Sequence, residues 1–168
     1  MARRLIGVIV GGADNALDDL RALAATRVTW PHDVIVIGVN QYPPELWPHH
    51  WVTLHPENLP IWSRTRDPAK TWSYKGAVDE ILPRWIGWGG SGLYAVKVAL
   101  HLHCSHIVLA GVPMDDRPHV GGVEPWADYL DHRKGWLKHR DKFDHRLRSM
   151  SGWTHETFGA PTPEWLSG

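Results

Sequence analysis

The stretch Leu5-Ile6-Gly7-Val8-Ile9-Val10, which the pair Gly11-Gly12 follows, decides the fold class of this chain. It contains no polar side chain and is rich in β-branched residues, which is typical of a strand buried on both faces of a sheet. The paired glycines end the strand, and Asp14 or Asn15 can cap a helix that continues to about residue 25. A buried strand that leads directly into a helix predicts the first unit of a parallel α/β sheet.

The same strand pattern recurs outward along the chain. Apolar runs over residues 34–39, 51–55 and 107–112 predict three further strands, and a helix is expected directly after Gly89-Gly90-Ser91-Gly92. That helix is apolar nearly all round, as a helix packed on a sheet should be. The alternation predicts a Rossmann-like, mostly parallel sheet with helices on both faces, in one domain over residues 1–168.

Three segments depart from this alternation. Residues 56–88 contain four prolines and several basic side chains, which predicts an irregular basic connection. Residues 125–150 are expected to form a long C-terminal helix, because an apolar residue recurs every seven positions at Tyr129, Trp136, Phe143 and Met150. Residues 151–168, with two prolines, are expected to form an irregular tail.

Composition narrows the class of protein. The 168 residues carry 18 Lys and Arg against 18 Asp and Glu, so strong attraction to nucleic acid or anionic lipid is not expected. No apolar run is long enough to span a membrane, and the single cysteine, Cys104, excludes an internal disulfide and fits a reducing compartment. We therefore expect a cytoplasmic protein without a membrane span. The eleven tryptophans suit interfaces or stacking platforms, which leaves a homo-oligomer open.

Glycine-rich and polar loops follow three of the predicted strands. These loops are residues 11–15, residues 40–41 and residues 111–116. Ligands of open α/β sheets bind at this edge, and the glycine-rich helix start at residues 89–92 favours an anion there. None of these four segments is a P-loop, because Gly-Lys-Ser/Thr is missing from them, and none by itself contains a full G-x-G-x-x-G fingerprint. The loops predict a small nucleotide-type ligand, and the alternative is that they are tight strand–helix turns.

Three stretches, residues 8–15, 36–41 and 91–111, together resemble the framework of the bacterial family 42 sialyltransferases. The first looks like that family's opening strand and Gly-Asn-Gly-Pro-Ser loop, and the second is similar to its strand ending in Cys-Asn-Gln. The third looks like its Ser-Gly helix and the strand that follows. The same framework occurs in the related MptE-like proteins, which include an archaeal 6-hydroxymethylpterin diphosphokinase.

The resemblance implies a nucleotide-sugar site of the CMP-sugar type. The residues it assigns to the cytidine and phosphate of the donor are Gly11, Asn15, Asn40, Gln41, Ser91 and Gly92. Gly12 stands where the family has Asn, and we keep it as a candidate because glycine lets a ligand approach the backbone. Pro113 replaces a family Asp, with Asp115 nearby as a further candidate. The family's catalytic base is a downstream histidine, and His139 and His145 lie at a comparable distance.

Three functions remain open at this point. The leading expectation is a transferase in which amides at Ser91-Gly92 and a basic segment around Arg64, Arg66 and Lys75 stabilise the leaving phosphate. The first alternative is an MptE-like diphosphokinase, which would need Mg²⁺ held by carboxylates such as Asp115 and Asp116. The second alternative is a non-catalytic binding or assembly module on the same fold.

Two sets of histidines are further candidates for metal or catalytic groups. Residues 101–106 are rich in possible ligands, but residues two apart on a helix point away from each other, so no metal site is expected. Asp128 with His132, and Asp141 with His145, are spaced one helical turn apart. Such pairs can orient a base, although exposed ion pairs are the commoner outcome.

Overall fold

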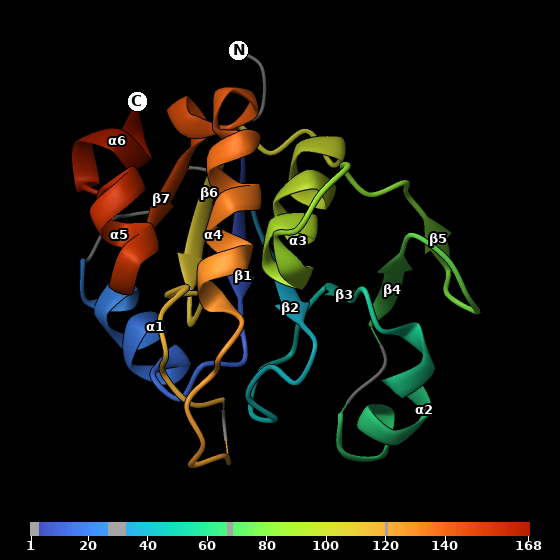
Figure 1. Cartoon of the computed structure of the whole chain (residues 1–168). Helices are drawn as coiled ribbons and strands as arrows, with labels where there is room; N and C mark the ends of the chain where they lie inside the picture. The colour runs from blue at the N-terminus through green and yellow to red at the C-terminus, as the bar shows by residue number, and fades with distance from the viewer. Residues whose placement is uncertain (1–3, 27–32, 67–68, 120) are drawn as a thin grey trace.

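Seven parallel strands form the centre of the molecule (Figure 1), in a computed structural model that describes residues 4–26, 33–66, 69–119 and 121–168. Their order across the sheet is β5-β4-β3-β2-β1-β6-β7, and every neighbouring pair is parallel. The strands are β1 Leu5–Val10, β2 Asp33–Val39, β3 His50–Val52, β4 Lys70–Ser73, β5 Glu80–Ile81, β6 His106–Ala110 and β7 Leu147–Ser149. This arrangement confirms the predicted Rossmann-like α/β fold.

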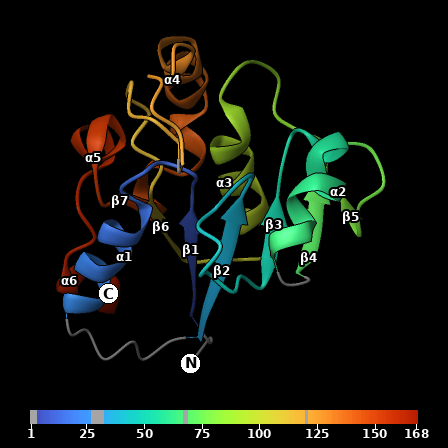
Figure 2. The same ribbon diagram turned by 90° about the horizontal axis from the view of Figure 1, so that it is seen from below.

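Helices cover both faces of the sheet (Figure 2). The α-helices are α1 Ala16–Ala25, α2 Leu59–Trp62, α3 Gly90–His101, α4 Tyr129–Lys138, α5 Gly152–Phe158 and α6 Pro163–Ser167. Short 3₁₀ turns lie at Pro56–Asn58, Ser63–Thr65, Arg140–Lys142 and Asp144–Arg146. Alternate residues of β1 point to opposite faces: Val8 packs in the core cluster with α1, whereas Ile9 packs in the cluster that contains α3. None of the described helices is long and apolar enough to pass through a membrane.

The connection from residue 56 to residue 88 is more regular than the sequence predicted. It contains α2 together with β4 and β5, which extend the sheet beyond β3. Trp72 of β4 is buried, and its indole Nε1 lies 3.0 Å from Nδ1 of His50 on β3. A short strand whose other residues are polar leaves little trace in an apolar pattern, because only one of its side chains is apolar.

The prediction of a long C-terminal helix over residues 125–150 is wrong. Helix α4 ends at Lys138, and the chain continues through two 3₁₀ turns into β7, which pairs with β6. The seven-residue repeat predicted one helix because Trp136 and Phe143 are both fully buried. Trp136 is on α4, however, whereas Phe143 lies between the two 3₁₀ turns, and the two ring centroids are 6.0 Å apart. Leu147 is likewise buried, as the first residue of the edge strand.

The prediction of an irregular tail over residues 151–168 is also wrong, because α5 and α6 occupy most of it. The side chain of Thr162 accepts a hydrogen bond from the backbone N–H of Trp165, and Pro163 is the first residue of α6. A threonine cap followed by proline is a recognisable helix start. Leu166 then anchors α6 in the core on the α1 side of the sheet.

Candidate functional site

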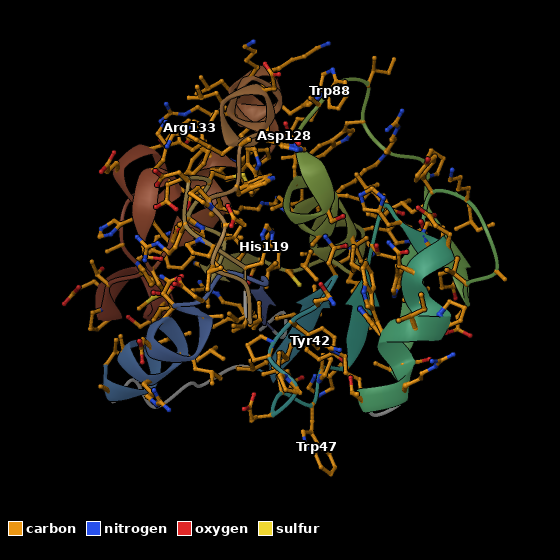
Figure 3. All side chains as sticks on the ribbon, turned by 60° about the horizontal axis from the view of Figure 1, so that its bottom comes forward. Tyr42, Trp47, Trp88, His119, Asp128 and Arg133 are labelled. Atoms are coloured by element: carbon orange, nitrogen blue, oxygen red, sulfur yellow. The ribbon has the colours of Figure 1, made fainter. Side chains whose placement is uncertain are left out.

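A cleft of ≈ 290 Å³ opens at the carboxyl edge of the sheet, where the chain order reverses between β1 and β6. This is the position at which open α/β sheets bind their ligands. Figure 3 turns that edge toward the viewer and shows His119 near its middle and Asp128 near the start of α4. The cleft is lined by residues 11–13, 39, 40, 55, 90–92, 111–115, 117, 119, 126, 128 and 132.

The lining includes most of the residues that were predicted from the sequence to bind the ligand. Those present are Gly11, Gly12, Asn40, Ser91, Gly92 and Asp115. Asn15 and Gln41 do not line the cleft. The Asn15 amide donates to Asp19 and to Ser151 instead, at 3.2 and 2.8 Å, and Gln41 is exposed.

The structure places both nominated catalytic histidines outside the cleft lining. His139 is buried, stacks on Trp85 at 5.1 Å between ring centroids, and has Nε2 3.0 Å from the carbonyl oxygen of Ile86. His145 is exposed and accepts a hydrogen bond from Arg146. These histidines were chosen because they lie about as far along the chain as the family's catalytic histidine, and that spacing does not bring them to the carboxyl edge of the sheet.

Three other histidines line the cleft: His55, His119 and His132. Of these, His132 had a usable sequence signal, because it lies one helical turn after Asp128, which also lines the cleft. His119 lies on the loop after β6, which the backbone of Ala13 bridges in antiparallel fashion. His55 follows β3, and no pattern in the sequence pointed to it.

The N-terminus of α3 supplies hydrogen-bond donors to the cleft. Its N-cap residue is Gly89, which has no side chain to accept from the first-turn N–H groups. The Ser91 hydroxyl oxygen accepts from the backbone N–H of Leu54 at 3.1 Å, so its own proton can be donated to a ligand. A twelve-residue helix also directs the positive end of its dipole here.

Asn40 is held in one orientation at the end of β2. Its backbone is strained, with φ at 49°, and its carbonyl oxygen accepts from the indole Nε1 of Trp51 at 2.8 Å. The fully buried hydroxyl of Thr53 lies 2.8 Å from Oδ1 of Asn40 and accepts from the N–H of His55. The proton of Thr53 therefore goes to Oδ1, which leaves the Asn40 NH₂ group as the end that can donate to a ligand.

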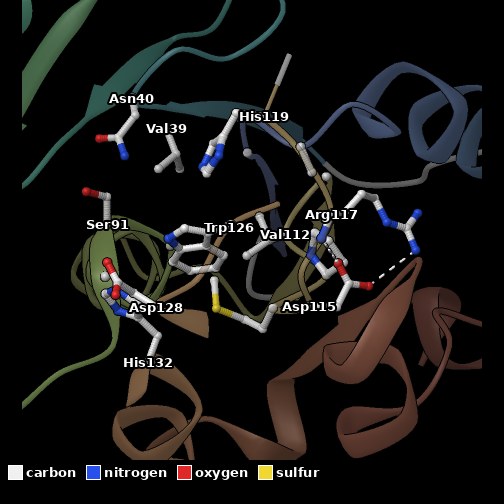
Figure 4. A pocket seen from close by; sticks show the side chains of 18 of the residues that line it. Val39, Asn40, Ser91, Val112, Asp115, Arg117, His119, Trp126, Asp128 and His132 are labelled. Atoms are coloured by element: carbon white, nitrogen blue, oxygen red, sulfur yellow. Dashed lines mark hydrogen bonds and ion pairs between the residues drawn. The ribbon is translucent and has the colours of Figure 1, made fainter. Parts of the chain in front are cut away.

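Trp126 forms an aromatic wall between two imidazoles (Figure 4). Its ring centroid lies 4.9 Å from that of His132 and 5.7 Å from that of His119. Burial lowers the pKa of His119, and burial also lowers the pKa of His132 against the opposing effect of Asp128 and Asp131. The Nδ1 atom of His132 is buried without a hydrogen-bond partner among the described residues. Both imidazoles are therefore neutral near pH 7.

Arg117 is the cationic side chain of the lining, and it is paired. Its guanidinium lies 3.2 Å from Oδ2 of Asp115, and its backbone N–H donates to Oδ1 at 3.1 Å. The basic segment named from the sequence lies elsewhere. Arg66 donates to the carbonyl oxygen of Tyr42, Lys75 lies over the Tyr74 ring, and neither they nor Arg64 line the cleft.

Tight packing accounts for two of the glycines. A Cβ on Gly11 would overlap the carbonyl oxygen of Gly111, and a Cβ on Gly111 would overlap the Cβ of Ala16. Gly111 also has a φ of 62°, and its N–H donates to the buried carboxylate of Asp19 at 2.8 Å. These glycines let the ends of β1 and β6 and the start of α1 come together under the cleft.

No family model, curated protein or solved structure matches the chain. Across the described residues, no group of three or more His, Cys, Asp and Glu side chains is arranged to hold a metal ion. Asp116, which was nominated with Asp115 for Mg²⁺, is exposed and does not line the cleft. The resemblance to sialyltransferases and MptE-like proteins stays a prediction.

Proposed function

We propose that the protein binds a nucleotide or nucleotide-sugar in the cleft and transfers the group attached to the phosphate to an acceptor. The observation that carries the proposal is the meeting of the uncapped N-terminus of α3 with the Trp126 wall in one cleft at the β1–β6 edge. A helix N-terminus favours phosphate, and an indole face stacks on a planar base. The two features together match the two halves of a nucleotide.

The proposed pose follows from the donors. The phosphate lies at the first turn of α3, where the Ser91 hydroxyl and backbone N–H groups can donate to its oxygens. The base lies along Trp126, and the NH₂ group of Asn40 donates to an acceptor atom on the base or ribose. The lining on this side presents donors, which suits a ligand rich in acceptor oxygens.

The proposed reaction is a displacement at the carbon that carries the phosphate. The acceptor hydroxyl attacks that carbon, the bond to the phosphate oxygen breaks, and the nucleotide leaves with the bonding electrons. Donors at the start of α3 stabilise the charge that develops on the phosphate. His132 is the candidate base, because it is neutral, its Nδ1 has no partner within the described chain, and Asp128 can stabilise the imidazolium.

A melting screen with CMP, UMP, AMP and GMP at millimolar concentration tests the binding step. A ligand at one hundred times its Kd adds about 2.7 kcal/mol to the free energy of unfolding. Ser91→Ala and Asn40→Ala should each reduce that gain, whereas Ser63→Ala and Asn58→Ala, outside the cleft, should leave it unchanged. No shift with any of the four nucleotides would refute the proposed site.

Turnover separates the transferase from a binding module on the same fold. The purified protein is incubated with the sugar derivative of the nucleotide that binds, and the release of free nucleotide is followed by chromatography. We expect release in the wild type and a loss of at least about tenfold in His132→Gln, since a general base contributes on the order of 10²–10⁴. Binding with no release, across donors and acceptors, would favour the non-catalytic module.

A further inference from the structure

The segment that leads from the end of β5 to the start of α3 exposes several large apolar side chains. It runs from Ile81 to Trp88 and reads Ile-Leu-Pro-Arg-Trp-Ile-Gly-Trp, with no acidic residue. The exposed fractions of Ile81, Ile86 and Trp88 are 61%, 83% and 73%. Figure 3 shows Trp88 at the border of the molecule, on the side opposite to Trp47. Single exposed apolar residues are ordinary, but several on one short segment mark an interaction surface.

Contacts with α4 and the turn after it hold the backbone of segment 81–88 in place, so the exposure of its side chains is not fraying. The ring of Trp85 stacks on that of His139 at 5.1 Å between centroids, and Nε2 of His139 lies 3.0 Å from the carbonyl oxygen of Ile86. A Cβ on Gly135 of α4 would overlap the carbonyl oxygen of Trp88. The fold therefore fixes this backbone while the side chains of Ile86 and Trp88 stay outside the core.

Two lysines from the flanking helices lie against segment 81–88. Lys97 of α3 donates from Nζ to the carbonyl oxygen of Pro83, and the same atom lies 5.8 Å from the centre of the Trp85 ring. Lys138 is the last residue of α4 and lies beside Gly87, where an added Cβ would be 3.8 Å from its Nζ. These lysines place positive charge next to the exposed apolar side chains.

Two further cations meet at Tyr74, the residue after β4. The guanidinium of Arg84 is 4.9 Å from the centre of the Tyr74 ring, and Nζ of Lys75 is 5.2 Å from it. In the described part of the chain, no ion pair involves either of these side chains, Lys97 or Lys138. The four positive charges are therefore not cancelled by a bonded carboxylate, although the whole chain has no net charge.

We propose that segment 81–88 docks the protein on an anionic membrane surface. The side chains of Ile86 and Trp88 enter the boundary between headgroups and acyl chains, where indole rings are favoured. The lysine and arginine side chains around them bury their aliphatic stems and keep their charged ends among the lipid phosphates. The proposal is independent of the nucleotide site, although the surface borders the cleft: the ring of Trp88 meets that of His132 at 6.3 Å between centroids.

Charge favours this partner over a second copy of the chain. A two-fold dimer brings the same patch of both copies together, so the four cations of one copy would face those of the other. Like charges across an interface oppose association, whereas negative lipid headgroups attract the same four cations. Because the chain as a whole is neutral, the attraction is local, and binding should need both the apolar side chains and the cations.

Co-sedimentation of the whole chain with phosphatidylcholine vesicles, prepared with and without phosphatidylserine, tests the proposal. The anionic vesicles should bind at least about fivefold more tightly, since one cation near an anionic surface contributes about that factor. Ile86→Ser combined with Trp88→Ser should weaken binding to the anionic vesicles by about tenfold or more, because two apolar side chains no longer enter the lipid. Ile61→Ser combined with Trp47→Ser is the matched control, with similar exposure on other elements, and should leave binding unchanged.

A second pair of variants isolates the cations. Arg84→Gln combined with Lys138→Gln should weaken binding to the anionic vesicles by about tenfold and leave binding to the neutral vesicles unchanged. Arg21→Gln combined with Arg64→Gln removes the same charge from α1 and from the turn after α2, and should change binding by less than about twofold. All four side chains are exposed, so each variant should melt as the wild type does, which a thermal scan checks.

Each competing result is specific. A wild type that does not bind the anionic vesicles would overturn the proposal, and so would equal losses in the variant of segment 81–88 and its apolar control. Sedimentation velocity without vesicles tests the other occupant. A wild-type dimer that becomes a monomer with Ile86→Ser and Trp88→Ser, together with no vesicle binding, would assign the surface to a second copy of the chain.

Discussion

Replacing Trp136 with alanine should remove a large part of the stability of this fold and also loosen the cleft. The indole is fully buried on α4, its Nε1 donates to the carbonyl oxygen of Gly89 at 3.0 Å, and its ring lies 6.0 Å from both Phe143 and Phe158. Truncation of a buried aromatic side chain costs about 3–5 kcal/mol, which includes the cavity it leaves. The lost hydrogen bond to a buried carbonyl contributes about 1 kcal/mol of that. For a domain with roughly 5–15 kcal/mol of stability, this is a severe change.

Urea denaturation followed by far-ultraviolet circular dichroism measures the effect without depending on tryptophan fluorescence. With an m-value of about 2 kcal/mol/M, a loss of about 4 kcal/mol lowers the midpoint by about 2 M. Trp47→Ala is the matched control, because Trp47 is 74% exposed and points away from the molecule (Figure 3), so its loss should stay within about 0.5 kcal/mol. A Trp136→Ala loss under about 1 kcal/mol would contradict the described packing.

A milder substitution links this packing to the cleft. Trp136→Phe keeps most of the apolar volume but removes the donor that holds Gly89, the N-cap residue of α3. We expect a stability loss of about 1–2 kcal/mol and a weaker affinity for whichever nucleotide binds the wild type. An unchanged affinity in a folded Trp136→Phe protein would mean that the Gly89 contact does not set the geometry of the site.

Two further predictions concern stability. Asp19→Ala should cost about 2–4 kcal/mol in urea denaturation, because the buried carboxylate accepts from the Gly111 N–H, Asn15 and Ser151, whereas Asp18→Ala next to it should change little; equal effects of the two would contradict the network. Burial lowers the pKa of His50, His119 and His132, so the unfolded state binds more protons than the folded state below pH 6.5. The free energy of unfolding should therefore fall as the pH is lowered from about 7 to about 5, and a flat profile over that window would show that folding does not lower the pKa of these three imidazoles.

The central strands were predictable because they are buried on both faces. The runs behind β1, β2 and β6 are apolar over their whole length, and such runs fit few other elements. β7 was not predictable in the same way, because it has three residues and one of them is Arg148. Its Leu147 fell at a position that also suited a long helix, and only pairing with β6 decides between the two.

The site was predictable as far as topology dictates it. Loops that follow parallel strands meet at one edge of a sheet, so Gly11, Asn40 and Asp115 had to lie close together once the strands were recognised. His132 could be picked out only by its spacing from Asp128, and Trp126 could not be assigned at all, because its position depends on where α4 begins and how the loop after β6 folds back. The backbone N–H of Asp14 donates to the carbonyl oxygen of Pro118 at 3.1 Å, and this hydrogen bond holds the loop after β6 against the loop after β1.

Glycine by itself turned out to be an ambiguous sign of a ligand. Gly11 and Gly111 are required by the close approach of strand ends and α1, so their presence says nothing about a phosphate. A ligand is instead indicated by polar side chains whose acceptor oxygens already bind protein donors, so that only their N–H or O–H groups remain to bind a ligand. Ser91 accepts from Leu54 and Asn40 accepts from Thr53, and each is left with a donor toward the cleft. Because packing can account for a glycine but not for a donor held toward an opening, these two side chains support the nucleotide proposal more strongly than the glycine loops that first suggested it.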